Sequence, residues 1–296
     1  MSTDEQATGE ATTGEATTGG PDTAGLIEAR FGLAPHFAQD APRTETVATM
    51  LRHRICRRFT DEPVDEATLE RLLAAALSTP AKSDLQQVAI IVVDDAERRG
   101  RIADLIPDMP WIRSCARFLL FCGDGRRIRR ICELHGIDFG NDHLDAVLNP
   151  AVDAALHLSS FVWAAESMGL GTCPISVVRN HIDAVSEICE LPDLVFPVSG
   201  LCIGHRGDTG HQVLRLPPAL TVHRDRYDDA AFVDELDGYD HRRDAVFSIP
   251  PDRQQYRERF GTASFYGWSL DKARQVSATE RADLAAFLRR KGFRLD

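Results

Sequence analysis

The feature that most constrains the fold is a segment, residues 149–169, that is apolar around nearly its whole helical circumference. It leaves only a narrow polar stripe of Asp153, His157 and Ser160. Such a helix is expected to be buried, either in the core of a large domain or between that core and a second subunit. Gly169 is expected to end it, since glycine is favoured directly after a helix. We interpret His157 as a hydrogen-bonded residue of this helix rather than as a ligand.

Short apolar runs with many branched side chains recur along the chain and predict strands that are covered on both faces. They span residues 88–93, 118–122 and 198–203. Pro197 and Gly204 flank the third run and favour a strand over a helix there. Residues 65–77 instead place leucines at helical spacing behind acidic residues, which predicts an amphipathic helix packed on the core. Together these segments predict a central sheet between helical layers.

Length and charge limit the function classes. A chain of 296 residues can bury a full core in one or two domains, and its net charge of -11 argues against nucleic acid as the main partner. Residues 1–25 repeat Thr, Gly, Ala and Glu without a basic residue, which predicts a disordered, acidic, low-complexity tail. They lack the features of a secretory signal, and no apolar run reaches the roughly 20 residues of a membrane helix. We therefore expect a cytoplasmic protein without a membrane partner.

Seven cysteines are scattered along the chain without a close Cys-x-x-Cys pair. Their odd number fits poorly with a disulfide framework, so most are expected to be reduced and buried. A zinc or iron–sulfur site needs clustered ligands, and the only tight pairing of His with Cys is His53 with Cys56. We therefore expect no metal site.

A basic cluster at residues 51–59 stands out in this acidic chain. It holds five cationizable side chains within nine residues, namely Arg52, His53, Arg54, Arg57 and Arg58. Arginine forks match the paired oxygens of a phosphate and stay charged at every working pH, so the cluster predicts a bound phosphate group. The alternative is a solvated basic patch near the end of a helix, where cations favour the negative end of the dipole.

A set of short motifs follows one order along residues 46–227, with a fainter echo at 287–292. They are His53-Arg54, Arg57, 59–63 (Phe-Thr-Asp-Glu-Pro), 79–86 (Thr-Pro-Ala-Lys-Ser-Asp-Leu-Gln), Phe121-Cys122, Asp124, 164–171 (Ala-Ala-Glu-Ser-Met-Gly-Leu-Gly), Arg179-Asn180, 191–193 (Leu-Pro-Asp) and 215–217 (Arg-Leu-Pro). This ordered set resembles the flavin-dependent nitroreductase family. Within that family it is most similar to the oxygen-insensitive NADPH nitroreductase and flavin reductase branch.

The resemblance implies an α+β, nitroreductase-like fold with a central, mainly antiparallel sheet flanked by helices, in a homodimer of the domain-swapped type. Residues 26–230 are expected to form the FMN-binding domain. Residues 231–296 are expected to form a C-terminal extension that packs on this domain or on the partner subunit. Two FMN sites are expected at the subunit interface, with NADPH or NADH as the electron donor.

The resemblance also implies which residues bind the cofactor. Residues expected to surround the flavin phosphate or ribityl chain are His53, Arg54, Arg57 and Arg215. Ser83 would add a hydroxyl donor, and Gln86 belongs to the same motif. The segment Pro174-Ile175-Ser176-Val177 is expected to run beside the isoalloxazine ring, where family members offer a backbone N–H to flavin N5. Hydride exchange with the flavin needs little acid–base help, so no catalytic residue is assigned.

Some positions depart from the pattern of this branch. Ile55, Ala81, Met109 and Val213 replace two Ser, a Gln and a Lys that are polar contacts in that pattern. Each lost hydrogen bond is worth about 1 kcal/mol, so FMN binding weakens unless Lys82 or another group compensates. Ser176-Val177 replaces a Gly-Gly, and because Val does not readily take a positive φ, we expect a shifted loop or a differently seated ring.

Two functions follow from these residues. The first is an FMN-dependent NAD(P)H oxidoreductase that reduces a nitro compound, a quinone, a flavin or a pathway-specific small molecule by ping-pong hydride transfer. The second is a protein of the same fold without classical reductase turnover, which binds or processes flavin or another ligand. Arg242 and Arg243 lie in an expected charged loop, which either binds the 2'-phosphate of NADPH or is simply solvated. No Gly-x-Gly-x-x-Gly follows a predicted strand, so no separate dinucleotide domain is expected.

Overall fold

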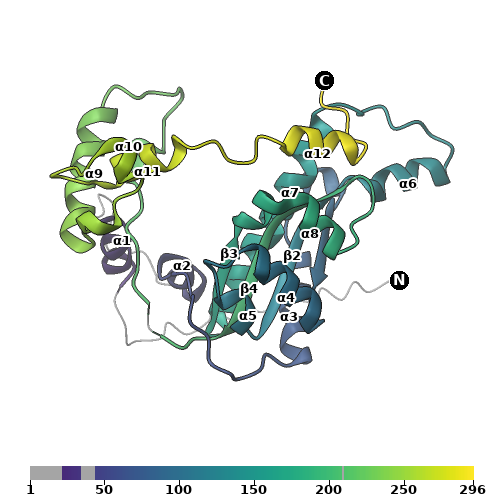
Figure 1. Ribbon diagram of the computed structural model, residues 1–296, viewed down its shortest axis with the longest axis horizontal. Coiled ribbons are helices and arrows are strands. Elements are labelled where there is room, and N and C mark those ends of the chain that lie inside the picture. The colour runs from purple at the N-terminus through teal and green to yellow at the C-terminus, as the bar shows by residue number, and fades with distance from the viewer. Residues whose placement is uncertain (1–21, 35–43, 209) are drawn as a thin grey trace, which may run out of the picture.

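A four-stranded antiparallel sheet forms the centre of the molecule (Figure 1). The computed structural model describes residues 22–34, 44–208 and 210–296. The strands, in the order of the sheet, are β1 (Val88–Val92), β2 (Arg117–Asp124), β4 (Val195–His205) and β3 (Leu170–Ile175). Three of them contain the predicted runs 88–93, 118–122 and 198–203 almost entirely, whereas β3 was not predicted as a strand.

Pro197 lies inside β4, so the prediction that it precedes this strand is wrong. Its Cα is paired with that of Cys122, next to an irregularity in the β2 register after Phe121. On the other side of β4, strand β3 pairs only with residues 200–205. Residues 195–199 therefore have a single neighbouring strand, and a proline without an N–H is tolerated at such an edge.

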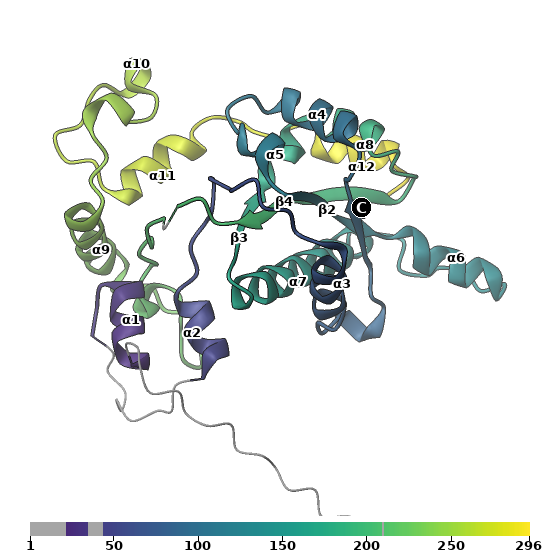
Figure 2. The ribbon, with the colours of Figure 1, turned by 90° about the horizontal axis from the view of Figure 1, so that it is seen from below.

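Helices cover both faces of the sheet, as predicted (Figure 2). One face is packed by α3 (Glu66–Leu77) and α7 (Asp145–Ser167). The other is packed by α4 (Ala96–Leu105), α5 (Trp111–Ser114) and α8 (Ile182–Ile188). Helix α3 is the predicted helix 65–77, and the Asp65 carboxylate caps it by accepting the Thr68 N–H at 2.7 Å. The predicted arrangement of a sheet between helical layers is confirmed.

Helix α7 is the predicted apolar helix, but its polar stripe faces the core and part of its apolar surface faces outward. The polar stripe faces inward: Asp153 and His157 are 0% and 1% exposed, and His157 Nδ1 lies 2.7 Å from the Asp153 carbonyl oxygen. The apolar residues Leu148, Val152 and Leu156 face outward and are 57%, 45% and 41% exposed. One side of α7 is thus packed in the core, and its exposed apolar side is left uncovered by the described residues.

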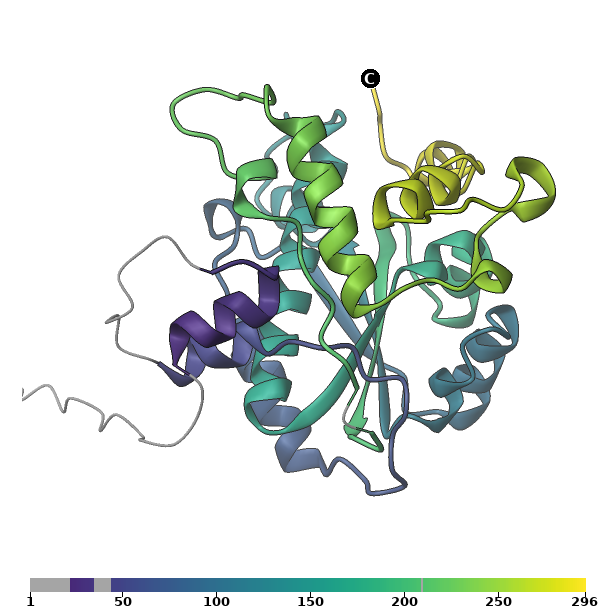
Figure 3. The same cartoon turned by 90° about the vertical axis from the view of Figure 1, so that its left-hand side faces the viewer.

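A second group of helices stands beside the sheet layers (Figures 1 and 3). It consists of α1 (Thr23–Phe31), α2 (Glu45–Leu51), α9 (Phe232–Val246), α10 (Arg257–Phe260) and α11 (Trp268–Val276). The charged residues 237–244 lie within α9, so the prediction that they form a loop is wrong. The Tyr239 hydroxyl on α9 donates to the Leu214 carbonyl oxygen at 2.9 Å and ties this group to the chain that leaves β4.

The remaining helices return to the sheet or project from it. Helix α12 (Leu284–Arg290) packs Phe287 and Leu288 against Phe196 of β4, whereas α6 (Arg126–Leu134) projects from the body (Figure 1). Among the described residues, no helix is long and apolar enough to cross a membrane. The predicted tail, residues 1–25, lies outside the described residues except for its last four, which include the start of α1.

Candidate functional site

A basic cavity of about 470 Å³ lies where the chain segments before β1 and after β4 meet. Its lining residues are Arg30, His53, Arg54, Ile55, Arg57, Arg58, Asp208, Gly210, His211, Val213 and Arg215. The structure thus brings together the four residues predicted to surround a flavin phosphate, although Arg215 is distant in sequence from the other three. The same cavity contains Ile55 and Val213, two of the positions that depart from the pattern of the branch.

The charges in this basic cavity are poorly balanced. Arg58 lies 4.0 Å from Asp208, which is the only acidic residue of the lining in the described part of the chain. Within the described part of the chain, the guanidinium groups of Arg54, Arg57 and Arg215 have no carboxylate partner, and the buried Arg54 Nε has no hydrogen-bond partner. An unsatisfied buried donor costs free energy unless a ligand accepts its hydrogen bond. The residues present therefore fit a phosphate group, whose oxygens accept from several guanidinium groups.

Arg30 of α1 fixes the backbone beneath the cavity. Its guanidinium donates to the carbonyl oxygens of Leu51 at 2.6 Å and 2.9 Å, of His53 at 2.5 Å and of Val213 at 3.1 Å. Burial, reinforced by the Arg215 cation, lowers the pKa of Arg30 to about 10. No sequence pattern indicated this role, because Arg30 precedes the recognised motifs and acts through carbonyl groups remote in sequence.

Glu166, near the C-terminal end of α7, accepts hydrogen bonds from three directions. His53 Nδ1 lies 3.0 Å from its Oε1, and the Thr172 hydroxyl donates to Oε1 at 2.9 Å. Arg206 Nη2 lies 3.4 Å from the same oxygen. The ring of His53 also meets Trp163 edge-on, with the centroids 5.3 Å apart. Glu166 belongs to a recognised motif, but its motif did not show that its carboxylate reaches the basic cluster.

The segment predicted to lie beside the flavin ring is at the end of β3. Pro174 and Ile175 end the strand, and Ser176 and Val177 open the 3₁₀ helix η2 (Ser176–His181). Val177 has no positive φ, and the expected shift of this loop or of the ring stays a prediction. The Ile175 side chain is buried, so only its backbone is available to a ligand. None of the four residues lines the basic cavity, and their contact with a flavin ring stays a prediction.

The structure places Ser83 and Gln86 far from the basic cavity of the same chain. Their loop, residues 79–87, contains the 3₁₀ turn η1 (Lys82–Asp84) and runs along the middle of α7, from Ser160 to Asp153. Ser83, Asp84 and Gln86 adopt φ values of 51°, 57° and 50°, which are unusual for residues other than glycine. Such strain often accompanies a functional site, because the surrounding structure must impose it.

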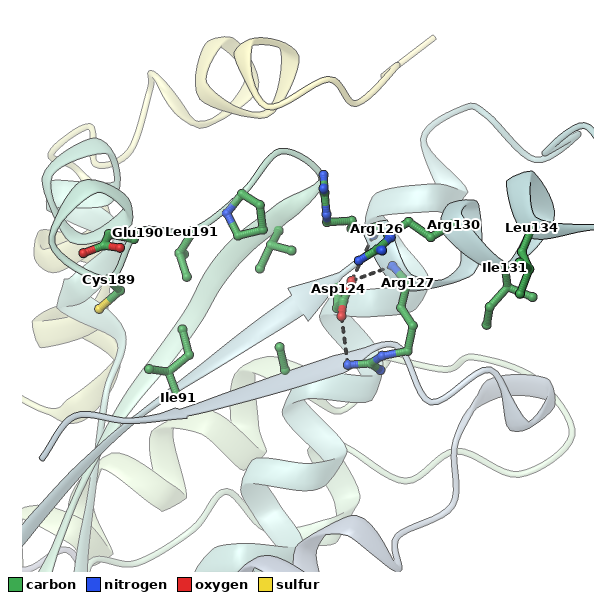
Figure 4. Close-up of a pocket in the computed structure, with 13 residues that line it drawn as sticks. Ile91, Asp124, Arg126, Arg127, Arg130, Ile131, Leu134, Cys189, Glu190 and Leu191 are labelled. Carbon is green, nitrogen blue, oxygen red and sulfur yellow. Dashed lines mark hydrogen bonds and ion pairs between the residues drawn. The ribbon is translucent and has the colours of Figure 1, made fainter.

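A second cavity, of about 590 Å³, opens near this loop at the other end of the sheet (Figure 4). Arg126, Arg127 and Arg130 of α6 lie on one side, and Ile91 of β1 contributes to its apolar lining. Here the Asp124 carboxylate accepts the backbone N–H groups of Arg126 and Arg127, each at 2.9 Å, and pairs with the Arg127 guanidinium at 2.9 Å. None of the predicted cofactor-binding side chains lines this second cavity.

No group of three or more His, Cys, Asp or Glu in the described ranges is arranged to hold a metal ion. All seven cysteines are free. The Cys56 thiol donates to the Arg58 carbonyl oxygen at 3.0 Å rather than joining His53. The chemistry available at the basic cavity is thus that of arginine, histidine and backbone groups.

Comparison with known proteins identifies the relationship of this chain. The sequence model of the nitroreductase family matches residues 50–205, and that of the C-terminal domain of the nitroreductase family matches residues 214–296. The chain belongs to the nitroreductase family. The predicted resemblance is confirmed, and the nitroreductase-like fold with a mainly antiparallel sheet is confirmed by solved structures.

Individual relatives cover most of this nitroreductase-family chain. A Bacillus subtilis protein named FMN reductase (NAD(P)H) is 34% identical over 254 residues, which are 85% of this chain and 99% of the relative. The oxygen-insensitive NADPH nitroreductase of Salmonella typhimurium is 37% identical over 182 residues, or 62% of this chain and 74% of that protein. The structure of the Vibrio harveyi NADPH:FMN oxidoreductase complexed with NAD⁺ aligns with a TM-score of 0.73 at 29% identity, over 84% of this chain and 98% of the other.

Proposed function

We propose that this protein is an FMN-dependent NAD(P)H oxidoreductase that reduces a small organic acceptor: a nitro compound, a quinone, a flavin or a pathway-specific molecule. The observation that carries the proposal is the basic cavity, where Arg54, Arg57 and Arg215 converge without carboxylate partners among the described residues. The named activities of the Bacillus, Salmonella and Vibrio relatives support FMN as the cofactor and a nicotinamide nucleotide as the donor.

The residues of this chain bind and orient rather than transfer protons. The guanidinium groups of Arg54, Arg57 and Arg215 would hold the FMN phosphate, and Arg30 keeps the carbonyl groups beneath them turned inward. Bound FMN supplies the hydride chemistry. Backbone N–H groups of residues 174–177 would stabilise negative charge on the reduced ring. No acid–base side chain is required, which agrees with the lack of an assigned catalytic residue.

We infer that the working protein is a homodimer and that each FMN site takes residues from both subunits. The outward apolar stripe of α7, formed by Leu148, Val152 and Leu156, supports a subunit interface. The Ser83 turn lies beside Asp153, about 20 Å along α7 from Glu166, which contacts His53 of the basic cavity. A partner that packs antiparallel along this stripe would bring its Ser83 loop to the basic cavity of the first subunit, completing a site that one chain leaves incomplete.

NADPH is the donor that the charges favour. On α9, the buried Nε and Nη2 atoms of Arg242 and the Nε of Arg243 have no hydrogen-bond partner in the described part of the chain. Arg243 shares a small cavity with His211, which also lines the basic cavity. The 2'-phosphate of NADPH would offer these donors charged acceptor oxygens, whereas NADH has only a neutral hydroxyl at the same position. Binding of the 2'-phosphate was one of the two roles predicted for Arg242 and Arg243 in a charged loop, and we now propose the same role for them on helix α9.

The test begins with the visible absorbance of the purified protein and mass spectrometry of whatever heat releases from it. Anaerobic addition of NADH and NADPH in separate titrations follows. We expect an FMN band that bleaches faster with NADPH. A protein that holds no flavin after incubation with FMN, or whose flavin neither donor reduces, would contradict the proposal and favour the alternative of a binding protein without reductase turnover.

A further inference from the structure

Two buried carboxylates of α7 suggest a role beyond packing. A helix rarely buries carboxylates, because a buried charge is costly unless hydrogen bonds compensate it. Asp153 lies on the inward polar stripe and is fully buried, whereas Glu166 lies on a different side of the helix near its C-terminal end, where its side chain is 6% exposed. Their hydrogen bonds lead to two predicted parts of the cofactor site rather than to structural neighbours at random.

Glu166 holds the basic cluster. A carboxylate only accepts hydrogen bonds, so the contact with His53 places a proton on His53 Nδ1 and orients the ring. The same carboxylate fixes Arg206, which donates to the Arg54 carbonyl oxygen at 3.4 Å. The Cys56 N–H donates at 2.8 Å to the carbonyl oxygen of Thr172, whose hydroxyl is also bound by Glu166. Glu166 therefore sets the path of the segment that carries Arg54 and Arg57.

Asp153 holds the strained loop 79–87. Its Oδ1 accepts the Lys82 N–H at 3.1 Å, and its Oδ2 accepts the Gln87 N–H at 2.8 Å. The two donors flank the residues with positive φ, among them Ser83 and Gln86. One carboxylate thus closes the loop at both ends and compensates for part of the backbone strain. Thirteen residues separate Asp153 from Glu166, which is about 20 Å along a helix.

We propose that Asp153 and Glu166 are positioning residues for the FMN site, and that the two carboxylates of one α7 serve different FMN sites of the dimer. Glu166 orients the phosphate-binding arginines of its own chain. Asp153 shapes the Ser83 loop that the same chain offers to its partner. This inference rests on the proposed function, and it adds two residues that touch no ligand themselves.

The first experiment measures FMN affinity in the single variants Glu166→Gln and Asp153→Asn. Each replacement keeps the size of the side chain and removes the charge, and an Asn in place of Asp153 can accept only one of the two N–H groups through its single oxygen. We expect FMN to bind about tenfold to a hundredfold more weakly in each. Glu187→Gln and Asp193→Asn, which change exposed acids, serve as matched controls and should bind like the wild type.

The second experiment distinguishes positioning from general destabilisation by means of heterodimers with two affinity tags. In a dimer of one Glu166→Gln chain and one Asp153→Asn chain, both changes fall in the same FMN site. The other site is intact, so half of the sites should keep wild-type affinity. In a dimer of one doubly substituted chain and one wild-type chain, each site carries one change, and no site should bind like the wild type.

The outcomes separate the inference from the function on which it rests. If wild-type protein binds no FMN, the proposed function fails. If wild-type protein binds FMN and each single variant binds it as tightly as the wild type does, the positioning role is wrong. If the first heterodimer has no intact site and the second keeps one, both carboxylates act within a single chain and the division between sites is wrong. Should a single variant fail to fold alone, its heterodimer with wild type still tests the positioning role, because one of the two sites should lose affinity and two sites of wild-type affinity would contradict that role.

Discussion

The two cavities at opposite ends of the sheet are both lined by arginines, but they differ in how these charges are balanced. In the second cavity, three arginines share the lining with two acids, and one of these acids, Asp124, pairs with Arg127 and caps the start of α6. Among the described residues that line the basic cavity, one acid, Asp208, faces five arginines and lies 4.0 Å from Arg58. The second cavity is larger, about 590 Å³ against about 470 Å³. We therefore expect the anionic cofactor in the basic cavity, because of its balance of charges rather than its volume.

If the Ser83 loop takes part in the FMN site, one chain gives only part of that site. The basic cavity supplies charge but lacks the Ser83 loop, which lies near the second cavity: the Arg127 guanidinium there donates to the Gln86 carbonyl oxygen at 2.6 Å. The loop supplies a strained backbone but few cations. If α7 joins two subunits antiparallel, the cation-rich end of one chain meets the loop end of the other. Substitutions at each end of the sheet and on α7 test this arrangement.

The largest effect is expected from a charge on the outward side of α7. Val152→Asp should raise the dimer dissociation constant by about a thousandfold or more, since both subunits would bury an unpaired carboxylate at a cost of several kcal/mol each. Light scattering across a concentration series measures this, with FMN affinity falling in parallel. Val222→Asp, at an exposed apolar residue away from α7, is the control. An unchanged dimer dissociation constant in Val152→Asp would show that the interface lies elsewhere.

Thiol reactivity should also distinguish the two ends, with a difference of about a hundredfold. Burial raises the pKa of Cys173, in β3, to about 11, which leaves little thiolate at pH 8. Cys132 on α6 is half-buried and should react with iodoacetamide far sooner. Peptide mapping by mass spectrometry follows both sites, and unfolded protein, in which all seven thiols react alike, is the control. Equal labelling of Cys132 and Cys173 in the native protein would show that β3 is accessible.

Arg57→Ala should weaken FMN binding by about tenfold to a hundredfold, since a hydrogen bond to a charged group is worth about 1.5 to 3 kcal/mol. Its side chain is exposed and stacks over Trp111, so the fold should persist. Arg130→Ala removes an exposed arginine of the second cavity and is the matched control. Fluorescence titration with FMN compares them. The opposite ranking, with Arg130→Ala the weaker binder, would move the phosphate to the second cavity.

The smallest effect concerns the strained loop. Ser83→Gly should raise the free energy of unfolding relative to Ser83→Ala by about 1 kcal/mol, because glycine tolerates the positive φ. Both changes remove the hydroxyl, so FMN affinity should fall alike, by about fivefold. Thermal unfolding of the apoprotein and FMN titration give the two quantities. If Ser83→Gly alone kept wild-type affinity, the hydroxyl would have no part in the site.

Much of the fold followed from local patterns, whereas the site required contacts that no local pattern contains. Apolar runs identified three strands and helical spacing identified α3, because burial on both faces or on one face imposes those patterns. The inward direction of the polar stripe on α7 could not be inferred, since it depends on the loop 79–87 that satisfies Asp153. Likewise, Arg30 and Glu166 act on residues remote in sequence, at Val213 and His53. Pro197 was misjudged because edge exposure depends on where β3 ends.

The most direct test of the central claim is the affinity of the wild-type protein for FMN compared with riboflavin, which has the same ring without the phosphate. If the basic cavity holds the phosphate, FMN should bind at least about a hundredfold more tightly, as expected for two or more charged hydrogen bonds. The advantage should shrink in Arg57→Ala. Equal affinity for the two flavins would contradict the account, because it would mean that the unpaired arginines do not contact the cofactor.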